Sequence, residues 1–367
     1  MAVQGLTTSF SVYDLFGTQP MSTSTNDVLA KAYQANAEKQ ITKQQKLIAN
    51  QSQVKIDAAK REMARWTPLT DGINSAQDNL NSAVSKAQSL DQTLFNMIDT
   101  LNTPTNISGD WSSQAARFDG LLSAITSMTG DDDPTNLLGS RQRGNTYQPN
   151  EVSYQASPNP QDQVTVYGSY AGSDTKITMA DGTFWMPLGS QGIQNYTLYP
   201  VAPIGYPQST GSGATTLDTP FNESSITFTT GQTVQNPQTY TGSVQRAGLG
   251  VMQSWLYDGL ATPDGRARAL QDIQNARTKL ESITSSLTAS QGLVAGDLAK
   301  VQQNIDDQAK LMTQLSTDAN KEVQTYVTKV QAQVQQQLNA AVNVGATPVV
   351  QMIHVGGRVG RLFDLLT

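Results

Sequence analysis

Apolar side chains recur at alternating intervals of three and four residues between residues 73 and 101. The nine positions are Ile73, Ala76, Leu80, Ala83, Ala87, Leu90, Leu94, Met97 and Leu101. This spacing is that of the a and d positions of a heptad repeat, which form one continuous stripe along a helix. Because such a stripe needs a partner along its whole length, we expect a coiled-coil seam that holds a helical rod together.

A candidate partner for this seam lies near the other end of the chain, where apolar residues recur at helical spacing between residues 270 and 342. We assign to the C-terminal side of the rod Leu298, Val301, Ile305, Leu315, Val323, Val330, Val334 and Leu338. Two such segments separated by a different middle predict an α+β fold. In it, a long antiparallel coiled-coil helical rod formed by the N- and C-terminal segments carries a small β-rich domain inserted between them.

Further helices are predicted in the N-terminal part of the chain. Asn26 and Asp27 are suitable caps for a helix that runs to about Arg65, and Pro68 then interrupts it. Its apolar stripe is thin, so we expect that stripe to be buried only on assembly. Thr70 is the expected cap of the seam helix, and a shorter amphipathic helix is expected at 111–128.

Composition changes sharply between residues 143 and 245. This stretch holds eight of the twelve Tyr and nine of the fifteen Pro residues of the chain. Alternating runs at 164–167 and 226–229, set between clusters of Gly, Pro, Asn and Asp, predict short strands. We therefore expect a surface-exposed β domain here, with helix resuming near Leu249 after it.

The predicted organisation has five segments. They are an irregular segment suited to export at 1–26, an N-terminal rod half at 27–142, the β-rich domain at 143–245, a C-terminal rod half at 246–345, and an apolar tail at 346–367. A turn is expected at 263–265 within the fourth segment. The tail carries the apolar anchors that we expect to drive assembly, namely Val349, Val350, Met352, Ile353, Leu362, Phe363, Leu365 and Leu366.

Charge and composition limit the partners. The net charge of −6 and the pI near 4.8 argue against nucleic-acid binding, which depends on Lys and Arg. No stretch approaches the roughly 20 apolar residues that a membrane-spanning helix needs. The N-terminus lacks the basic start and continuous apolar core of a cleaved secretory signal. We expect a chain that is soluble, or exported by a route without such a signal.

Catalytic and metal-binding motifs are not evident. The chain has no Cys and one His, His354, which rules out thiolate metal sites and makes His-rich zinc sites untenable. The acidic run 131–133 lacks the alternating ligands and distal Glu of a calcium loop, so we interpret it as a solvated turn. We predict no catalytic, metal or cofactor-binding residues.

The segment TDGINSAQDNLNSAVSKAQSLDQTLFNMIDTLN at 70–102 resembles the N-terminal rod helix of bacterial flagellins. The segment at 283–341 resembles their C-terminal rod, and the order of helix, variable β insert and helix is similar as well. The Leu-Ser-x-Gly element usual in flagellins between the first helix and the rod is missing. A divergent flagellin, a hook-filament junction relative and another filament subunit therefore stay open.

The resemblance implies a non-enzymatic structural subunit of an extracellular, cell-surface helical filament, exported without a cleaved signal. Its expected partners are other copies of the chain, an export chaperone, and cap or junction proteins. One alternative is a type III secretion tip or translocator-like protein, or another surface or virion structural protein. Another is a glycan-binding module on a coiled-coil stalk, because the Tyr residues of the β domain offer rings on which sugars stack.

Overall fold

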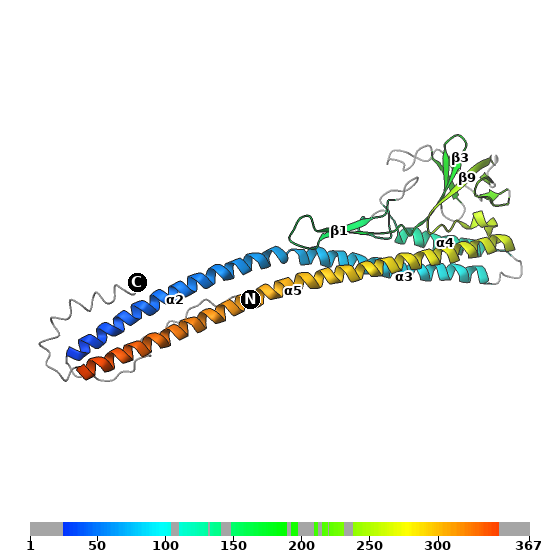
Figure 1. Cartoon of the computed structure of the whole chain (residues 1–367). Coiled ribbons are helices and arrows are strands. Elements are labelled where there is room, and N and C mark those ends of the chain that lie inside the picture. Colours follow the sequence, from blue (N-terminus) through cyan, green and yellow to red (C-terminus); the bar gives the residue numbers. More distant parts are fainter. Residues whose placement is uncertain are drawn as a thin grey trace. The chain divides into compact units, whose positions relative to one another are not determined.

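The computed structural model of the chain describes residues 25–103, 110–130, 133–140, 148–188, 192–196, 209–211, 215–218, 220–230 and 238–344. Within this part the fold combines helices with small antiparallel sheets, so the α+β class is confirmed at that level (Figure 1). The chain divides into two compact units. Unit 1 comprises residues 1–65 and 303–367, and unit 2 comprises residues 66–302.

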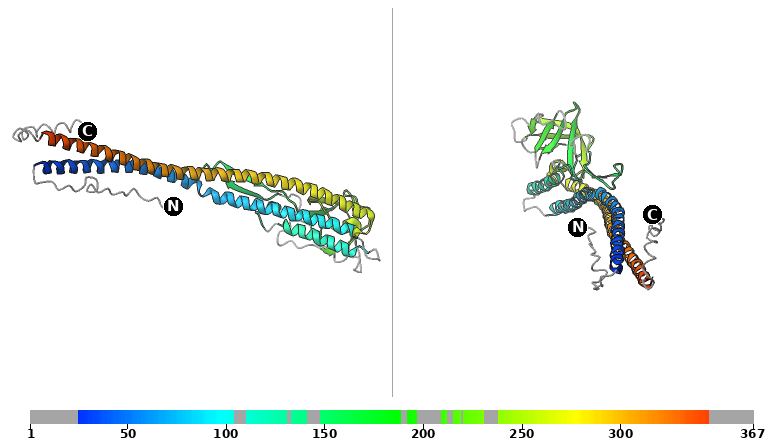
Figure 2. Two further views of the ribbon diagram at one scale, coloured as in Figure 1. Left: turned by 90° about the horizontal axis from the view of Figure 1, so that it is seen from below. Right: turned by 90° about the vertical axis from the view of Figure 1, so that its left-hand side faces the viewer.

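Unit 1 pairs helix α2 (Thr25–Trp66) with the C-terminal part of α5 (Pro263–Val344), as Figure 2 shows. One apolar cluster joins residues 37–48 to residues 319–334, and a second joins Ile56 and Ala59 to Met312. Because higher numbers on α2 meet lower numbers on α5, the two helices run antiparallel. The stripe of α2 is thus buried within the single chain, and the expectation that it is buried only on assembly is wrong.

Unit 2 begins with a turn at residues 67–68, after which α3 (Leu69–Asn102) starts. The predicted helix break at Pro68 is confirmed. Thr70 lies inside the first turn of α3 and does not cap it; its hydroxyl donates to the Thr67 carbonyl at 2.7 Å. The helix predicted at 111–128 is α4 (Ser112–Met128), which packs against α3.

Two predictions about the chain after residue 248 need correction. Helix does not resume near Leu249: the first helical element is the 3₁₀ helix η1 (Ser254–Leu260). No turn separates η1 from a later start of α5, because Pro263 is itself the first residue of α5. Proline suits that position, since the first backbone N–H of a helix has no intrahelical acceptor to lose. Backbone with non-helical dihedral angles lies instead within η1, at Asp258 and Gly259, which have φ of 57° and 59°.

The strands form two antiparallel sheets. A hairpin pairs β1 (Glu151–Gln155) with β2 (Gln163–Tyr167), and β1 packs against α3. The larger sheet consists of β3 (Ser173–Met179), β4 (Phe184–Leu188), β5 (Gly192–Tyr196), β6 (Ser209–Gly211), β7 (Thr216–Leu217), β8 (Ile226–Thr230) and β9 (Gln238–Gly248). Its strand order is β6-β5-β4-β3-β9-β8-β7. The strands predicted at 164–167 and 226–229 are confirmed.

One face of the larger sheet packs on η1. Phe228 from β8 contacts Trp185 from β4 with ring centroids 6.0 Å apart, and contacts Trp255 from η1 at 5.8 Å. On the opposite face, the hydroxyls of Thr227 and Thr241 hydrogen bond across the strands at 3.1 Å. Because β9 continues to Gly248 and shares this aromatic core with η1, the predicted domain boundary at 245 falls inside a strand.

Candidate functional site

The nine seam positions predicted on α3 are all buried, and none exceeds 7% exposure. The neighbouring stretch of α5 buries Ile273, Ala276, Leu280, Ile283, Leu287, Val294 and Val301. Two polar contacts fix the direction of this pair. Arg277 Nε donates to Asp91 Oδ1 at 2.8 Å, and Gln291 Nε2 donates to Asn81 Oδ1 at 2.8 Å. The higher α3 residue meets the lower α5 residue, so α3 and α5 are antiparallel in unit 2.

The eight positions predicted on the C-terminal side are divided between the units. Leu298 is partly buried and Val301 buried in unit 2, whereas in unit 1 Ile305, Leu315 and Leu338 are partly buried and Val323, Val330 and Val334 are buried. From Leu315 onwards the partner is α2, so the prediction that these residues face the seam at 73–101 is wrong for them. The reason is length: α5 has 82 residues and α3 only 34.

The tail anchors predicted to drive assembly, Val349, Val350, Met352, Ile353, Leu362, Phe363, Leu365 and Leu366, lie outside the described residues. So do His354 and two of the three residues of the acidic run. The third, Asp133, accepts hydrogen bonds from the Thr135 hydroxyl at 2.6 Å and the Thr135 backbone N–H at 2.9 Å. Both bonds lower the pKa of the Asp133 carboxyl below its usual range, and the bond from the Thr135 hydroxyl has the larger effect.

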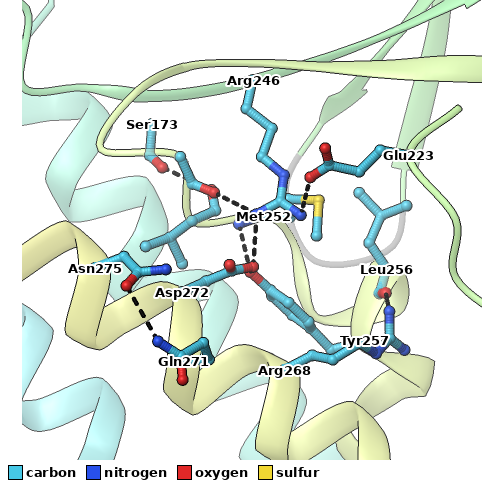
Figure 3. Close-up of polar contacts among 12 residues, drawn as sticks. Ser173, Glu223, Arg246, Met252, Leu256, Tyr257, Arg268, Gln271, Asp272 and Asn275 are labelled. Carbon is cyan, nitrogen blue, oxygen red and sulfur yellow. Dashed lines mark hydrogen bonds and ion pairs between the residues drawn. The ribbon is translucent and has the colours of Figure 1, made fainter.

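A polar network joins the sheet to the helices of unit 2 (Figure 3). Arg246 from β9 donates through Nη1 to Asp272 Oδ2 of α5 at 2.7 Å, and its Nη2 pairs with Glu223. Tyr257 from η1 donates to the same Asp272 oxygen at 2.7 Å. Burial first, and then the Asp272 charge, raise the pKa of the Tyr257 hydroxyl well above its ordinary value, so it stays a donor. The network ties three elements together.

A second polar contact lies between α4 and η1. The carboxylate of Asp119 is 3% exposed and accepts from the Ser254 backbone N–H at 2.7 Å and from the Ser254 hydroxyl at 2.6 Å. Burial raises the pKa of this carboxyl to about 7, against the two hydrogen bonds, which lower it. Asp119 therefore titrates near neutral pH at a contact between two elements, where a change of charge alters stability.

No group of three or more His, Cys, Asp and Glu residues able to hold a metal ion occurs within the described ranges. An open groove of about 930 Å³ runs between α3 and α5, lined among others by Ala87, Asp91 and Arg277. None of the described helices is both long enough and apolar enough to cross a membrane.

Comparison with protein-family models gave no match, and comparison with curated proteins gave none either. The surfaces of the two helix pairs are therefore interpreted from their own chemistry.

Several of these contacts could not be located from the sequence. Asp119 is one acidic residue on an amphipathic helix, and Arg246 and Asp272 are 26 positions apart in segments with different patterns. Tyr154 of the β1–β2 hairpin donates to Asp297 of α5 at 2.8 Å across 143 positions.

Proposed function

We propose that this chain is a structural subunit that polymerises into an extracellular helical filament of the flagellin-like kind, without catalytic activity. In this proposal the two helix pairs belong to one long antiparallel rod, and the β-rich segment is an insertion in it. Contacts between copies repeat along a screw axis, and such heterologous contacts yield a fibre because they do not close into a ring.

The observation that carries the proposal is the use of one helix by both units. The N-terminal segments α2 and α3 each pair antiparallel with a different part of α5. A subunit built from both ends of its chain in this way presents long, polar helix surfaces. The outer positions carry amides and hydroxyls such as Gln92 and Thr93, which form local hydrogen bonds along the helix. Surfaces of this kind suit repeated lateral contact with other copies.

The expected partners are other copies of the chain, an export chaperone, and cap or junction proteins at the filament ends. Export to the cell surface without a cleaved signal belongs to the same proposal. The apolar anchors of segment 346–367 are expected to be buried between subunits, at about 1.5 to 3 kcal/mol for each fully buried side chain before the cost of ordering the segment.

Electron microscopy of the concentrated, purified chain tests the proposal. We expect unbranched filaments hundreds of subunits long, and we expect a variant that lacks 346–367 to stay a folded monomer with unchanged helical circular dichroism. Monomers or small closed caps from the full chain would overturn the filament function. Filaments of normal length from the truncated chain would move the assembly surface from the tail to the rod.

A further inference from the structure

We propose that the outward face of α2 in one copy docks on the outward face of α3 in a second copy, through lysine and aspartate side chains at matched spacing. This inference rests on the proposed function and names the surface by which two subunits meet.

Helix α2 supplies the positive face. It contains eight Lys and Arg residues against four Asp and Glu residues, and all eight cationic side chains are exposed. Lys60 and Arg65 pair with carboxylates one turn away. Lys39, Lys43 and Lys46 make no ion pair or hydrogen bond within the part of the chain that the structure describes. Their charges are therefore available to a partner.

These lysines lie opposite the buried stripe of α2. Lys39 and Lys46 are seven residues apart and so lie on one side of the helix, about 160° and 140° from Ile41 at 100° per residue. Two aliphatic side chains flank the same face, Leu47 at 45% exposure and Val54 at 67%. The stripe of α2 packs on α5, and among the described residues of unit 1 the lysines of this second face stay exposed.

Helix α3 supplies the negative face. It contains four Asp residues against a single Lys. Asp91 pairs with Arg277, and Asp99 with Arg117. Asp71 and Asp78 are exposed and make no ion pair among the described residues. They too are seven residues apart, outside the a and d stripe.

The two faces match in spacing. Seven residues of helix span about 10.5 Å, so Lys39 and Lys46 align with Asp71 and Asp78 whether the helices dock parallel or antiparallel. Within one chain, a hairpin of α2 and α3 about the turn at 67–68 would not satisfy this match, because it would place Asp78 beside residues near 57, about ten positions short of Lys46. The complementary charges therefore identify a second copy as the occupant.

Charge reversal tests the docking surface through the critical concentration for assembly, measured by sedimentation. Either Lys39→Glu with Lys46→Glu, or Asp71→Lys with Asp78→Lys, should raise the critical concentration at least tenfold. Combining all four changes should return it to within threefold of the unmodified chain. Lys31→Glu with Lys55→Glu is the matched control, with the same charge change on exposed positions outside the seven-residue register. Equal assembly of all variants, or no recovery in the combined variant, overturns the proposal.

Cross-linking tests contact between copies, because the chain has no cysteine of its own. One copy carries Lys46→Cys, and a second copy with a tag of different size carries either Asp78→Cys, which faces residue 46 in parallel docking, or Asp71→Cys, which faces it in antiparallel docking. A mixed disulfide is the expected product of one of these two pairings. Its absence from both pairings under conditions in which the two copies co-assemble overturns the proposal.

Two further outcomes separate this inference from its alternatives. If vesicles containing phosphatidylserine bind the unmodified chain and not the Lys39→Glu, Lys46→Glu variant, while assembly is unchanged, the face is a lipid-binding surface and the docking proposal fails. If the unmodified chain never polymerises, the filament function fails, and the mixed disulfide alone decides whether α2 meets α3 of a second copy. Polymers that ignore the charge changes overturn the docking and leave the filament function standing.

Discussion

Unit 1 and unit 2 differ in the number of elements that pack together in their cores. In the described part of unit 1, one apolar interface joins two helices, and the side chains buried there are Ala, Ile, Val and Met. Unit 2 packs helices against each other and against two sheets, and buries large aromatic residues such as Tyr257, Phe118 and Phe228. A helix with one partner loses its whole interface when that partner leaves. The comparison teaches that unit 1 is the part whose order depends most on its neighbours, within the chain or between copies.

The largest expected effect lies in unit 2. Leu94 is completely buried in α3. Leu94→Ala should cost about 2 to 5 kcal/mol of unfolding free energy, and Leu94→Asp more, because it buries an unpaired charge. Urea denaturation followed by tryptophan fluorescence measures this, since all four Trp residues lie between 66 and 302. Gln92→Ala, at an exposed position, is the control. If the Leu94 variants unfolded at the same urea concentration as the unmodified chain, the seam would not contribute to the stability of unit 2.

A cavity in the α2–α5 interface should destabilise unit 1 and leave unit 2 unchanged. Ile48 is 2% exposed in the α2–α5 interface, and Ile48→Ala should cost about 2 to 5 kcal/mol there. We expect loss of helical circular dichroism at lower urea while tryptophan fluorescence is unchanged, because unit 1 contains no Trp. A single transition seen equally by both signals would mean that the two units unfold together and that the contrast between them is wrong.

The pH dependence of unit 2 sharpens the comparison further. The pKa of Asp119 is raised from 3.8 to about 7 in the folded chain, so the folded state holds this proton more tightly than the unfolded state. Its contribution to stability is complete below pH 4 and is lost as the pH rises to 7, by at most about 4 kcal/mol. Asp119→Asn should remove that slope from the fluorescence-detected unfolding free energy between pH 4 and 7. An unchanged slope would locate the titration elsewhere.

The smallest effect is expected at the ion pair between α3 and α5. Arg277 and Asp91 are 40% and 48% exposed, so solvent screens their attraction. Arg277→Ala should cost about 0.2 to 1 kcal/mol in 0.15 M salt. A double-mutant cycle with Asp91→Ala isolates the pair. A coupling well above 1 kcal/mol would show that polar contacts, as well as the apolar seam, set the α3–α5 register.

The α3 seam was predictable because apolar side chains occupy nine successive a and d positions, between residues 73 and 101, without a break. The stripe of α2 was harder to recognise: its buried residues at 41, 48, 56 and 59 are spaced by seven, eight and three, which departs from the heptad. The pairing of Val323, Val330 and Val334 with α2 could not be assigned either, since apolar spacing identifies a buried face and does not say which helix covers it.

Errors at the end of the β-rich segment have a local cause. The apolar residues from Leu249 to Leu256 suit a helix by composition, yet Val251 and Met252 are completely buried in a segment that is neither helix nor strand. Ser173 Oγ donates to the Val251 carbonyl at 2.6 Å, which holds this stretch against β3. Tertiary contacts of this kind override local preference. The polar contacts of Asp119 and Arg246 could not be predicted from the sequence either, because they too depend on tertiary contacts.

The sharing of α5 has a consequence for how the chain folds. Unit 1 joins residues 37–48 to residues 319–334. Forming this contact therefore closes a loop that contains most of the chain. Loop closure of that length is entropically costly, and contacts between distant residues slow folding. Once unit 2 has joined α3 to the start of α5, the loop left to close is much shorter. Folding should therefore proceed from the middle of the chain outwards, with α2 and the end of α5 closing last.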